Sequence, residues 1–327
     1  MTGLWGPIAA LVAAAVLGSI GRWLGTRAAI RSRLVRPHAR PLPDIGGIVI
    51  ALAMAVGLLV GSLVAPGIPG PTVAMVIVLL ASLGLGLAHD RFGLPRWVRG
   101  VLVLALGTAL AASGLQLGGL PSVPLEWLGT IVIFAASLTA VDMEDGLDGL
   151  ATGVAFLTAF GLAVIAARGG GPEILALVLA ASALGFLIVN APPAAVFLGN
   201  NGTYLLGAGL AIVTIAIGRT VPLLLGALTC FGLLWVELLL AAIRRVTRGS
   251  PVTAGYGAHL YDQMLARGLT TYRALVVSYI LQVAFVAAGV AIASVLSELA
   301  AAVFAVVWLA ALGALFAGRF VSYKVGG

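Results

Sequence analysis

Eleven long runs of apolar residues dominate the 327-residue sequence and restrict the kind of fold it can adopt. A bilayer crossing needs roughly 20 mostly apolar residues, and lipid cannot hydrogen-bond an open sheet edge, so such runs predict helices. We therefore predict an all-α polytopic membrane protein in which residues 1–327 form a single transmembrane domain. The predicted spans are Leu4–Leu24, Ile45–Ala65, Thr72–Ala88, Val101–Leu117, Trp127–Ala140, Gly149–Ala167, Ile174–Val189, Thr203–Gly218, Val221–Ile243, Ala274–Leu296 and Leu299–Ala317.

The composition excludes the main alternatives to a membrane protein. Hydrophobic residues make up 61% of the chain and charged residues 9%, whereas soluble domains carry about 45–50% apolar and about 25% charged residues. These values exclude a disordered chain and an ordinary cytosolic enzyme. The single cysteine, Cys230, excludes a disulfide-stapled secreted module. The arginines are dispersed without a platform of stacking aromatic residues, so we expect no nucleic-acid partner.

Basic residues predict the orientation of the spans. Sixteen of the eighteen fall in one set of loops, and only Arg168 and Arg219 fall in the other set. The positive-inside rule places the sixteen in the cytoplasm. Because the predicted number of spans is odd, the N-terminus is then outside and the C-terminus is cytoplasmic.

Seven of the eleven acidic residues lie on the predicted cytoplasmic side. Glu237 is different, because it lies inside the ninth predicted span. An intramembrane carboxylate is a functional candidate by default. Alternatively, Glu237 pairs with Arg244, about two helical turns away, and the residues leave both interpretations open.

Two cytoplasmic segments carry residues that a plain connection would not need. Segment 38–48, HARPLPDIGGI, ends with Gly46 and Gly47, which allow another backbone or a ligand to approach closely. Segment 88–100, AHDRFGLPRWVRG, places His89 and Asp90 at a helix end. This pair is either catalytic or part of an interfacial ion pair between Asp90 and a neighbouring arginine.

A third segment, 141–153, is the most acidic, with the sequence VDMEDGLDGLATG. Asp142, Asp145 and Asp148 are three residues apart, so on a helix they form one stripe. Carboxylates this close repel each other unless a cation such as Mg²⁺ shared with phosphate oxygens, or nearby arginines, compensates them. A solvated acidic turn is the alternative, although a turn between two membrane helices needs no such cluster.

Two further cytoplasmic segments could contact a phosphate or the membrane surface. Segment 190–203, NAPPAAVFLGNNGT, contains a Gly-Asn-Asn-Gly turn whose backbone N–H groups, at the start of a helix, could hold a phosphate. In segment 244–273, His259, Tyr261 and Asp262 lie on a predicted short amphipathic helix. An interfacial helix is the simpler interpretation of that segment and is compatible with a functional role.

The order and wording of these five segments resemble the polyprenyl-phosphate N-acetylhexosamine-1-phosphate transferases, glycosyltransferase family 4. HARPLPDIGG is similar to the family's HKRPxPRxGG, AHDRFGLP to DDRFGLP, and DMEDGLDGLATG to NxxDGLDGLA. NAPPAAVFLGNNG is similar to NxPPAxxFMGDxG, and SPVTAGYGAHLYDQMLARGLTTYRA to SPxxxDRxHLHHRLLxRGLS. The resemblance implies a multi-pass enzyme of the bacterial plasma membrane, with its active face cytoplasmic, that works in cell-envelope glycan synthesis. Its partners would be polyprenyl phosphate, a UDP-sugar and the lipid bilayer, with a homodimer or other envelope-synthesis proteins as further candidates.

The resemblance also implies a reaction and a set of site residues. Polyprenyl phosphate attacks the β-phosphorus of a UDP-sugar and releases UMP, with Mg²⁺ or Mn²⁺ neutralising the diphosphate. The implied catalytic residues are Asp90, Asp145, His89 and His259. The implied substrate-binding residues are Asp148, Asn190, Phe197, Gly46, Gly47, Arg40 and Asp262, and the implied metal ligands are Asp142, Asp145 and Asn200.

The departures from the family pattern fall on the most important positions. His89 replaces the first aspartate of the DD pair, and Asn200 replaces the metal-binding aspartate of FMGD. The chain nevertheless keeps five aspartates at these motifs, with new ones at Asp142 and Asp262, which favours a rearranged working site over simple decay. A catalytically degenerate homologue that binds lipid-linked precursors or assists envelope assembly remains the alternative. The other substitutions in the motifs are Ala39, Thr139 and Tyr261.

Overall fold

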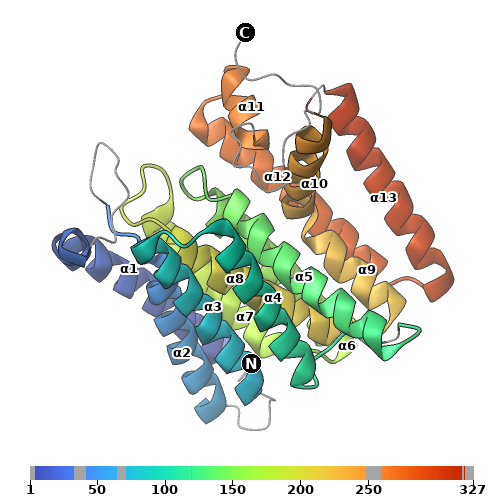
Figure 1. Ribbon diagram of the computed structural model, residues 1–327, viewed down its shortest axis with the longest axis horizontal. Coiled ribbons are helices and arrows are strands. Elements are labelled where there is room, and N and C mark those ends of the chain that lie inside the picture. The colour runs from blue at the N-terminus through green and yellow to red at the C-terminus, as the bar shows by residue number, and fades with distance from the viewer. Residues whose placement is uncertain are drawn as a thin grey trace.

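The computed structural model describes residues 4–32, 42–64, 71–118, 120–247, 259–318 and 320, without the side chains of residues 24–32 and 247. Figure 1 shows an all-helical bundle. Within the described residues, the only extended pairing is an isolated bridge between Asp44 and Phe197. The helices are α1 (Trp5–Ser32), α2 (Gly46–Val64), α3 (Val73–Phe92), α4 (Arg96–Ala112), α5 (Val123–Met143), α6 (Leu150–Gly169), α7 (Glu173–Asn190), α8 (Gly199–Ile217), α9 (Val221–Cys230), α10 (Gly232–Thr247), α11 (Leu260–Ala266), α12 (Thr271–Ile292) and α13 (Ser297–Ala317).

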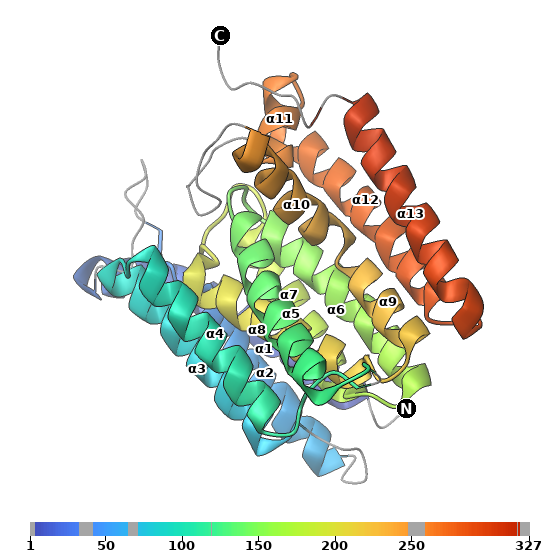
Figure 2. The same cartoon turned by 45° about the vertical axis from the view of Figure 1, so that its right-hand side comes forward.

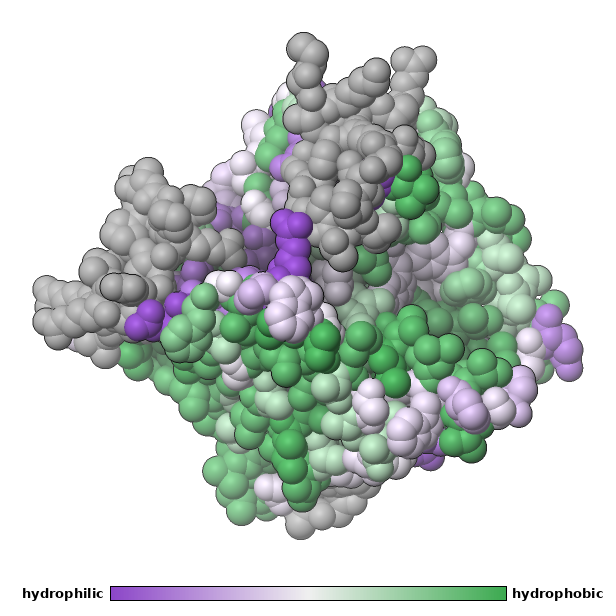
Figure 3. Space-filling view, in the orientation of Figure 1, coloured by the Kyte–Doolittle hydropathy of each residue, from purple (hydrophilic) through white to green (hydrophobic). Residues whose placement is uncertain are grey.

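Helix α8 forms the centre of the bundle. Some 94% of its span is buried, compared with 6% of the span in α13. It packs against α2, α3, α5, α6, α7 and α9, whereas α13 lies at the outside and packs mainly against α9 and α12 (Figures 1 and 2). The lower half of the surface in Figure 3 is mostly hydrophobic, as expected of helices that face lipid.

Nine described helices are long and apolar enough to cross a membrane, and ten if one bent pair counts as a single span. Helix α4, with 17 residues, is slightly shorter. Each of the eleven predicted spans therefore corresponds to helix in the structure, which confirms the all-α polytopic fold. The ninth predicted span is not continuous, however, because it bends by 74° between α9 and α10.

The bend in the ninth span lies at Phe231 and leaves backbone groups without their usual helical partners. Gln282 of α12 supplies those partners, since its side-chain amide donates to Cys230 O at 2.7 Å and its carbonyl accepts from Leu233 N at 3.1 Å. Gly232 is required at this point, because a Cβ there would overlap the ring of Phe285. Broken helices persist at membrane depth only where neighbouring helices re-satisfy the backbone, and Gln282 does so here.

The ends of the bundle carry the polar segments. Figures 1 and 2 place the start of α1 and the end of α13 at opposite ends of the molecule. The end of α3, the turn after α5, the start of α8 and helix α11 lie toward the end where α13 finishes. In Figure 3 hydrophilic side chains gather near the top of the same view, between regions drawn in grey. That this end faces the cytoplasm stays a prediction from the basic residues.

Candidate functional site

The first part of the site is a cluster of one carboxylate and two amides, Asp90, Asn200 and Asn201, which we call the amide cluster. Helix α3 ends at Phe92 because Gly93 adopts a left-handed conformation with φ 63°, and Asp90 lies in the last turn. Its Oδ1 accepts from the backbone and side-chain N–H of Asn200 at 3.1 and 2.6 Å. Its Oδ2 accepts from the backbone and side-chain N–H of Asn201 at 2.9 and 2.7 Å. Asp90 thereby attaches the end of α3 to the start of α8.

The start of α2 joins the amide cluster through Gly46 and Gly47. Gly47 N donates to the side-chain oxygen of Asn201 at 2.7 Å, and the Asn201 amide donates to Asp44 O at 3.0 Å. A Cβ on Gly46 would lie 2.6 Å from the backbone of Leu198. The glycine pair was predicted to allow a close approach, and in the structure the approaching group is the backbone of α8.

Asp142 lies beside this cluster at the end of α5. Thr203 Oγ1 in the first turn of α8 is 3.0 Å from its Oδ1, and Arg99 Nη1 is 3.9 Å from its Oδ2. The same Arg99 nitrogen donates to the Tyr204 hydroxyl at 3.2 Å. An arginine therefore lies next to the first aspartate of the acidic loop, residues 142–148, as the repulsion among those carboxylates requires.

Two buried nitrogen atoms around Arg99, the neighbour of Asp142, make no hydrogen bond within the described chain. They are Arg99 Nε and His89 Nδ1, and Arg99 and Asp90 are the charged neighbours of His89. Most buried polar groups in proteins are hydrogen-bonded. Unused nitrogen atoms beside a positively charged side chain are suited to binding an anion.

Asp148 and Asn190 hold the loop that leads into α8. Asp148 Oδ2 accepts from Ala194 N at 2.9 Å. The Asn190 amide donates to Val196 O at 3.0 Å and accepts from Thr152 at 2.7 Å. Both predicted substrate-binding residues therefore make internal hydrogen bonds in the structure.

The second part of the site is the histidine cluster, Glu237, His259 and Tyr261. His259 Nδ1 is 2.7 Å from Glu237 Oε1, and the rings of His259 and Tyr261 stack at a centroid distance of 5.3 Å. The hydroxyl of Tyr261 lies against Gly146 of the acidic loop, where a Cβ would overlap it. Burial strongly raises the pKa of the Tyr261 hydroxyl, and the nearby carboxylates, with Asp262 first, raise it further.

Glu144 lies in the same region, directly after α5. Its side chain is buried, and this burial raises the pKa of its carboxyl well above the ordinary value. The charge of Glu237 raises that pKa further. The histidine cluster and the acidic loop thus form one electrostatic unit, and Asp142 joins that unit to the amide cluster.

The structure separates some of the predicted residues. Asp262 accepts from His259 N at 3.0 Å and caps α11, and no hydrogen bond or ion pair between described side chains joins it to His89. The aspartate at 262 and the histidine at 89 therefore belong to different clusters. The backbone of Phe197 pairs with Pro43 and Gly46 at the start of α2. Arg40 lies outside the described residues.

Sequence reasoning missed three residues that make hydrogen bonds at the site, Asn201, Thr203 and Tyr204. It also missed that Arg99 lies beside Asp142. Asn201 and Thr203 stand in the same turn as Asn200, so their place at a predicted helix start was the available signal. Glu237 was identified as a candidate, but its partner was not. His259 is 22 residues away along the chain, and no spacing in the sequence connects the two.

No group of three or more His, Cys, Asp or Glu side chains in the described parts of the chain could hold a metal ion. Asp90 accepts four hydrogen bonds from N–H donors. A carboxylate that ligates a metal must keep a lone pair for the ion, so it could not accept N–H groups at every lone pair. These residues do not form a protein-only cage. Mg²⁺, however, is commonly held by one or two carboxylates together with substrate phosphates and water, and Asp142, with 30% of its side chain exposed, fits that arrangement.

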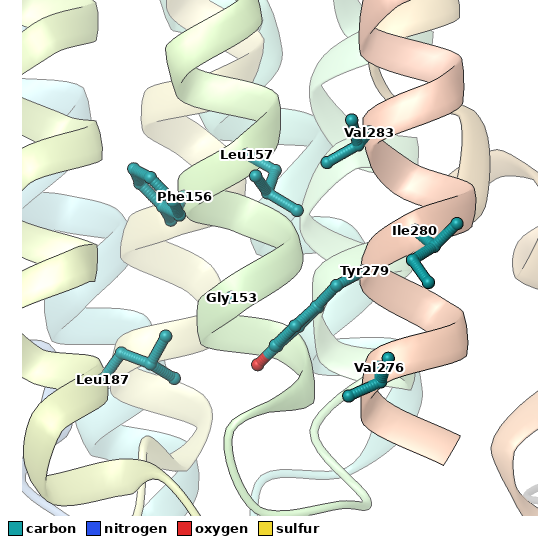
Figure 4. A pocket seen from close by; sticks show the side chains of 8 residues that line it. All are labelled: Gly153, Phe156, Leu157, Leu187, Val276, Tyr279, Ile280 and Val283. Carbon is teal, nitrogen blue, oxygen red and sulfur yellow. The ribbon is translucent and has the colours of Figure 1, made fainter. Parts of the chain in front are cut away.

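An apolar groove of about 410 Å³ lies between α6, α7 and α12 (Figure 4). Gly153, Phe156 and Leu157 line one side, and Val276, Tyr279, Ile280 and Val283 line the other, with Leu187 at one end. The Tyr279 hydroxyl donates to Gly149 O at 2.8 Å and so connects α12 to the start of α6. The groove has no polar group left for phosphate chemistry.

Comparison with known proteins connects this arrangement to a family. Residues 72–218 match the model of glycosyl transferase family 4. A decaprenyl-phosphate N-acetylglucosaminephosphotransferase from Mycobacterium leprae is 30% identical over 89% of this chain and 82% of its own length. The chain belongs to glycosyl transferase family 4. The members of this family are phosphosugar transferases and in general depend on a divalent metal.

Other relatives of this family 4 protein carry related names. A probable undecaprenyl-phosphate N-acetylglucosaminyl 1-phosphate transferase from Bacillus subtilis is 28% identical over 75% of this chain and 71% of its own length. A phospho-N-acetylmuramoyl-pentapeptide-transferase from Synechococcus is 33% identical over 56% of each chain. The segment of the family 4 protein that matches the model contains the amide cluster and the acidic loop, whereas α10 and α11 lie beyond it.

Proposed function

We propose that this protein transfers a sugar-1-phosphate from a UDP-sugar to a polyprenyl phosphate during cell-envelope glycan synthesis. An oxygen of the lipid phosphate attacks the β-phosphorus of the UDP-sugar and forms a new P–O bond. The bond from that phosphorus to the bridging oxygen breaks, and UMP leaves with the electron pair. The lipid phosphate is already anionic, so the protein has mainly to bind, orient and neutralise the reacting groups.

The observation that carries this proposal is a pair of nitrogen atoms, one on Arg99 beside Asp142 and one on His89, whose charged neighbours are Arg99 and Asp90. Arg99 Nε and His89 Nδ1 are buried and make no hydrogen bond to the described residues. The phosphate oxygens of a nucleotide sugar would accept from both. The two residues lie where the end of α3, α4, the end of α5 and the start of α8 meet, at the end of the bundle that the basic residues predict to be cytoplasmic.

Asp90 is one of the implied catalytic residues, but its carboxylate is already engaged in hydrogen bonds. Its two oxygens already accept four N–H groups from Asn200 and Asn201. We assign it to holding the first turn of α8, so that the turn is ordered before the substrate arrives. Asp142 and Asp145 would hold a divalent ion that arrives with the diphosphate, and such an ion would neutralise the charge that develops on the leaving phosphate.

The test is exchange of labelled UMP into UDP-sugars by the purified full-length protein, with polyprenyl phosphate and Mg²⁺ or Mn²⁺. We expect exchange, and we expect Asp145→Asn to reduce it by about 100-fold or more, because the charge next to the diphosphate is lost. Glu298→Gln, at the start of α13, is the matched control and should exchange at the wild-type rate.

The degenerate homologue predicts a different result in the same assay. It would show no exchange with any UDP-sugar of the panel while it still bound vesicles that contain polyprenyl phosphate. That result would overturn the proposed function and favour a binding role.

A further inference from the structure

Glu237 is a fully buried carboxylate in α10, just after the break in the ninth span. A buried charge is strongly unfavourable unless it is hydrogen-bonded and paired. Its Oε2 accepts from Leu260 N at 2.8 Å, and its Oε1 is 2.7 Å from His259 Nδ1. The carboxylate therefore contacts the start of α11. Of the two interpretations left open by the sequence, pairing with Arg244 is not the one that the structure supports.

The donor and acceptor roles in these contacts decide which nitrogen of His259 carries a proton. An ionised carboxylate is only an acceptor, and a backbone N–H already donates to Oε2 of Glu237. His259 Nδ1 must then donate to Oε1. The other ring nitrogen, Nε2, makes no hydrogen bond to the part of the chain that is described, and 16% of the side chain is exposed.

The plane of the His259 ring is also fixed. Tyr261 stacks on it with an interplanar angle of 6°. Tyr261 in turn lies against Gly146 and close to the charges of Asp145 and Glu144. Rotation of the His259 ring would break both its stack on Tyr261 and its contact with Glu237, so Nε2 keeps one direction relative to the acidic loop.

We infer that Glu237 is a positioning residue that fixes the Nδ1–H form of His259, so that Nε2 is the atom that gains or loses a proton when a phosphate binds beside the acidic loop. This role rests on the proposed function, because the phosphate belongs to the substrates of that reaction. Glu237 does not touch the substrate and acts only through His259. The carboxylates of Glu144, Asp145 and Asp262 lie close to Tyr261, whose ring stacks on that of His259.

Substitution of Glu237 by Gln tests the direction of this hydrogen bond without changing the shape of the side chain. The Gln oxygen is needed by Leu260 N–H, so the Gln amide nitrogen must face His259 and donate to Nδ1. Nδ1 then becomes an acceptor, and the neutral ring must carry its proton on Nε2. A substitution that only destabilised the structure would not move the ring proton from Nδ1 to Nε2.

The chain contains three histidines, which makes the ring forms measurable by NMR. The full-length protein, labelled with ¹⁵N-histidine and held in detergent at about pH 9, has neutral imidazoles, and His38→Gln and His89→Gln assign the other two signals. We expect the Nδ1–H pattern for His259 in the wild type and the Nε2–H pattern in Glu237→Gln. The same pattern in both proteins would overturn the inference, as would Nε2–H in the wild type. Glu173→Gln, the same substitution at the first residue of α7, should keep the wild-type pattern.

Exchange of UMP supplies the second measurement. Glu237→Gln should lower the exchange rate by about 10-fold to 100-fold, the range seen when a carboxylate that orients a histidine is removed. His259→Gln should lower it at least as much, and the double variant should be no worse than His259→Gln alone. Additive losses would contradict the inference. Glu237→Asp, which keeps the charge, should recover part of the rate.

The two measurements separate the inference from the proposed function. If the wild type shows no UMP exchange, the proposed function fails, while the NMR comparison still decides the form of His259. If exchange occurs and the ring form of His259 does not depend on Glu237, the inference alone fails.

Discussion

Asp90 and Glu237 are both carboxylates that join helices at the site, but they differ in burial and in the groups that hydrogen-bond to them. Asp90 is partly exposed and accepts N–H groups from Asn200 and Asn201, two neighbouring residues. Glu237 is fully buried and contacts His259, a side chain that can itself carry a proton. The amide cluster therefore orders backbone without exchanging protons, whereas the histidine cluster can change its protonation when a ligand binds.

Asp90→Ala should be the most damaging change to the amide cluster. The four N–H groups of Asn200 and Asn201 lose their acceptor, so we expect a loss of about 3 kcal/mol in the free energy of unfolding. Thermal unfolding of the purified protein in detergent measures this loss. Asp90→Asn keeps one acceptor oxygen and should lie between the alanine variant and the wild type. An unchanged unfolding midpoint in Asp90→Ala would show that the cluster does not hold α8.

Gln282→Leu should be the next most damaging change, and it tests the support of the histidine cluster. It removes the hydrogen bonds to Cys230 O and Leu233 N at the bend that leads into α10. We expect a loss of about 2 kcal/mol, since hydrogen bonds within membranes are individually modest and two backbone groups are left unpaired. Thr158→Val, which removes only the partner of the same amide, is the matched control and should lose less.

The two clusters also differ in how far the sequence predicts them. Asp90 and Asn200 stand in recognisable motifs at predicted helix ends, so their presence at the site was predicted, although not their hydrogen bonds to each other. Glu237 stands in an apolar run, and its contact with His259 depends on the bend at Phe231. Because that bend is stabilised by Gln282 from another helix, no local pattern in residues 221–243 could predict it.

Asn200→Asp tests whether the amide cluster has replaced a metal site. The variant places a carboxylate where the Asn200 amide lies 2.6 Å from Asp90, so the two charges repel. We expect a loss of about 1–2 kcal/mol in the absence of divalent ions, and a recovery in millimolar Mg²⁺ that the wild type does not show. Thermal unfolding with and without Mg²⁺ measures both effects. Asn200→Ala loses the hydrogen bond without adding charge, so its stability should not respond to Mg²⁺.

Gly146→Ala tests the contact between the histidine cluster and the acidic loop. The new methyl group would overlap the Tyr261 hydroxyl, and overpacking of this kind costs about 1 kcal/mol or more. Tyr261→Phe removes the hydroxyl and should reduce the effect of the alanine in the double variant. If the two substitutions were additive in unfolding experiments, Tyr261 would not be the group that requires glycine at this position.

The smallest expected effect is that of Glu144→Gln on the pH dependence of stability. It tests whether a titrating carboxyl lies beside the histidine cluster. Burial raises the pKa of Glu144, and the charge of Glu237 adds to this. A carboxyl whose pKa is higher in the folded state binds more protons when folded, so its contribution is largest at low pH. That contribution is lost as the pH rises from the ordinary value of 4.5 toward the raised pKa. Glu144→Gln removes this loss and should flatten the fall of the unfolding midpoint as the pH rises above the ordinary value of 4.5. Glu126→Gln, in the first turn of α5, should keep the wild-type slope. An unchanged slope in Glu144→Gln would place the titrating group elsewhere.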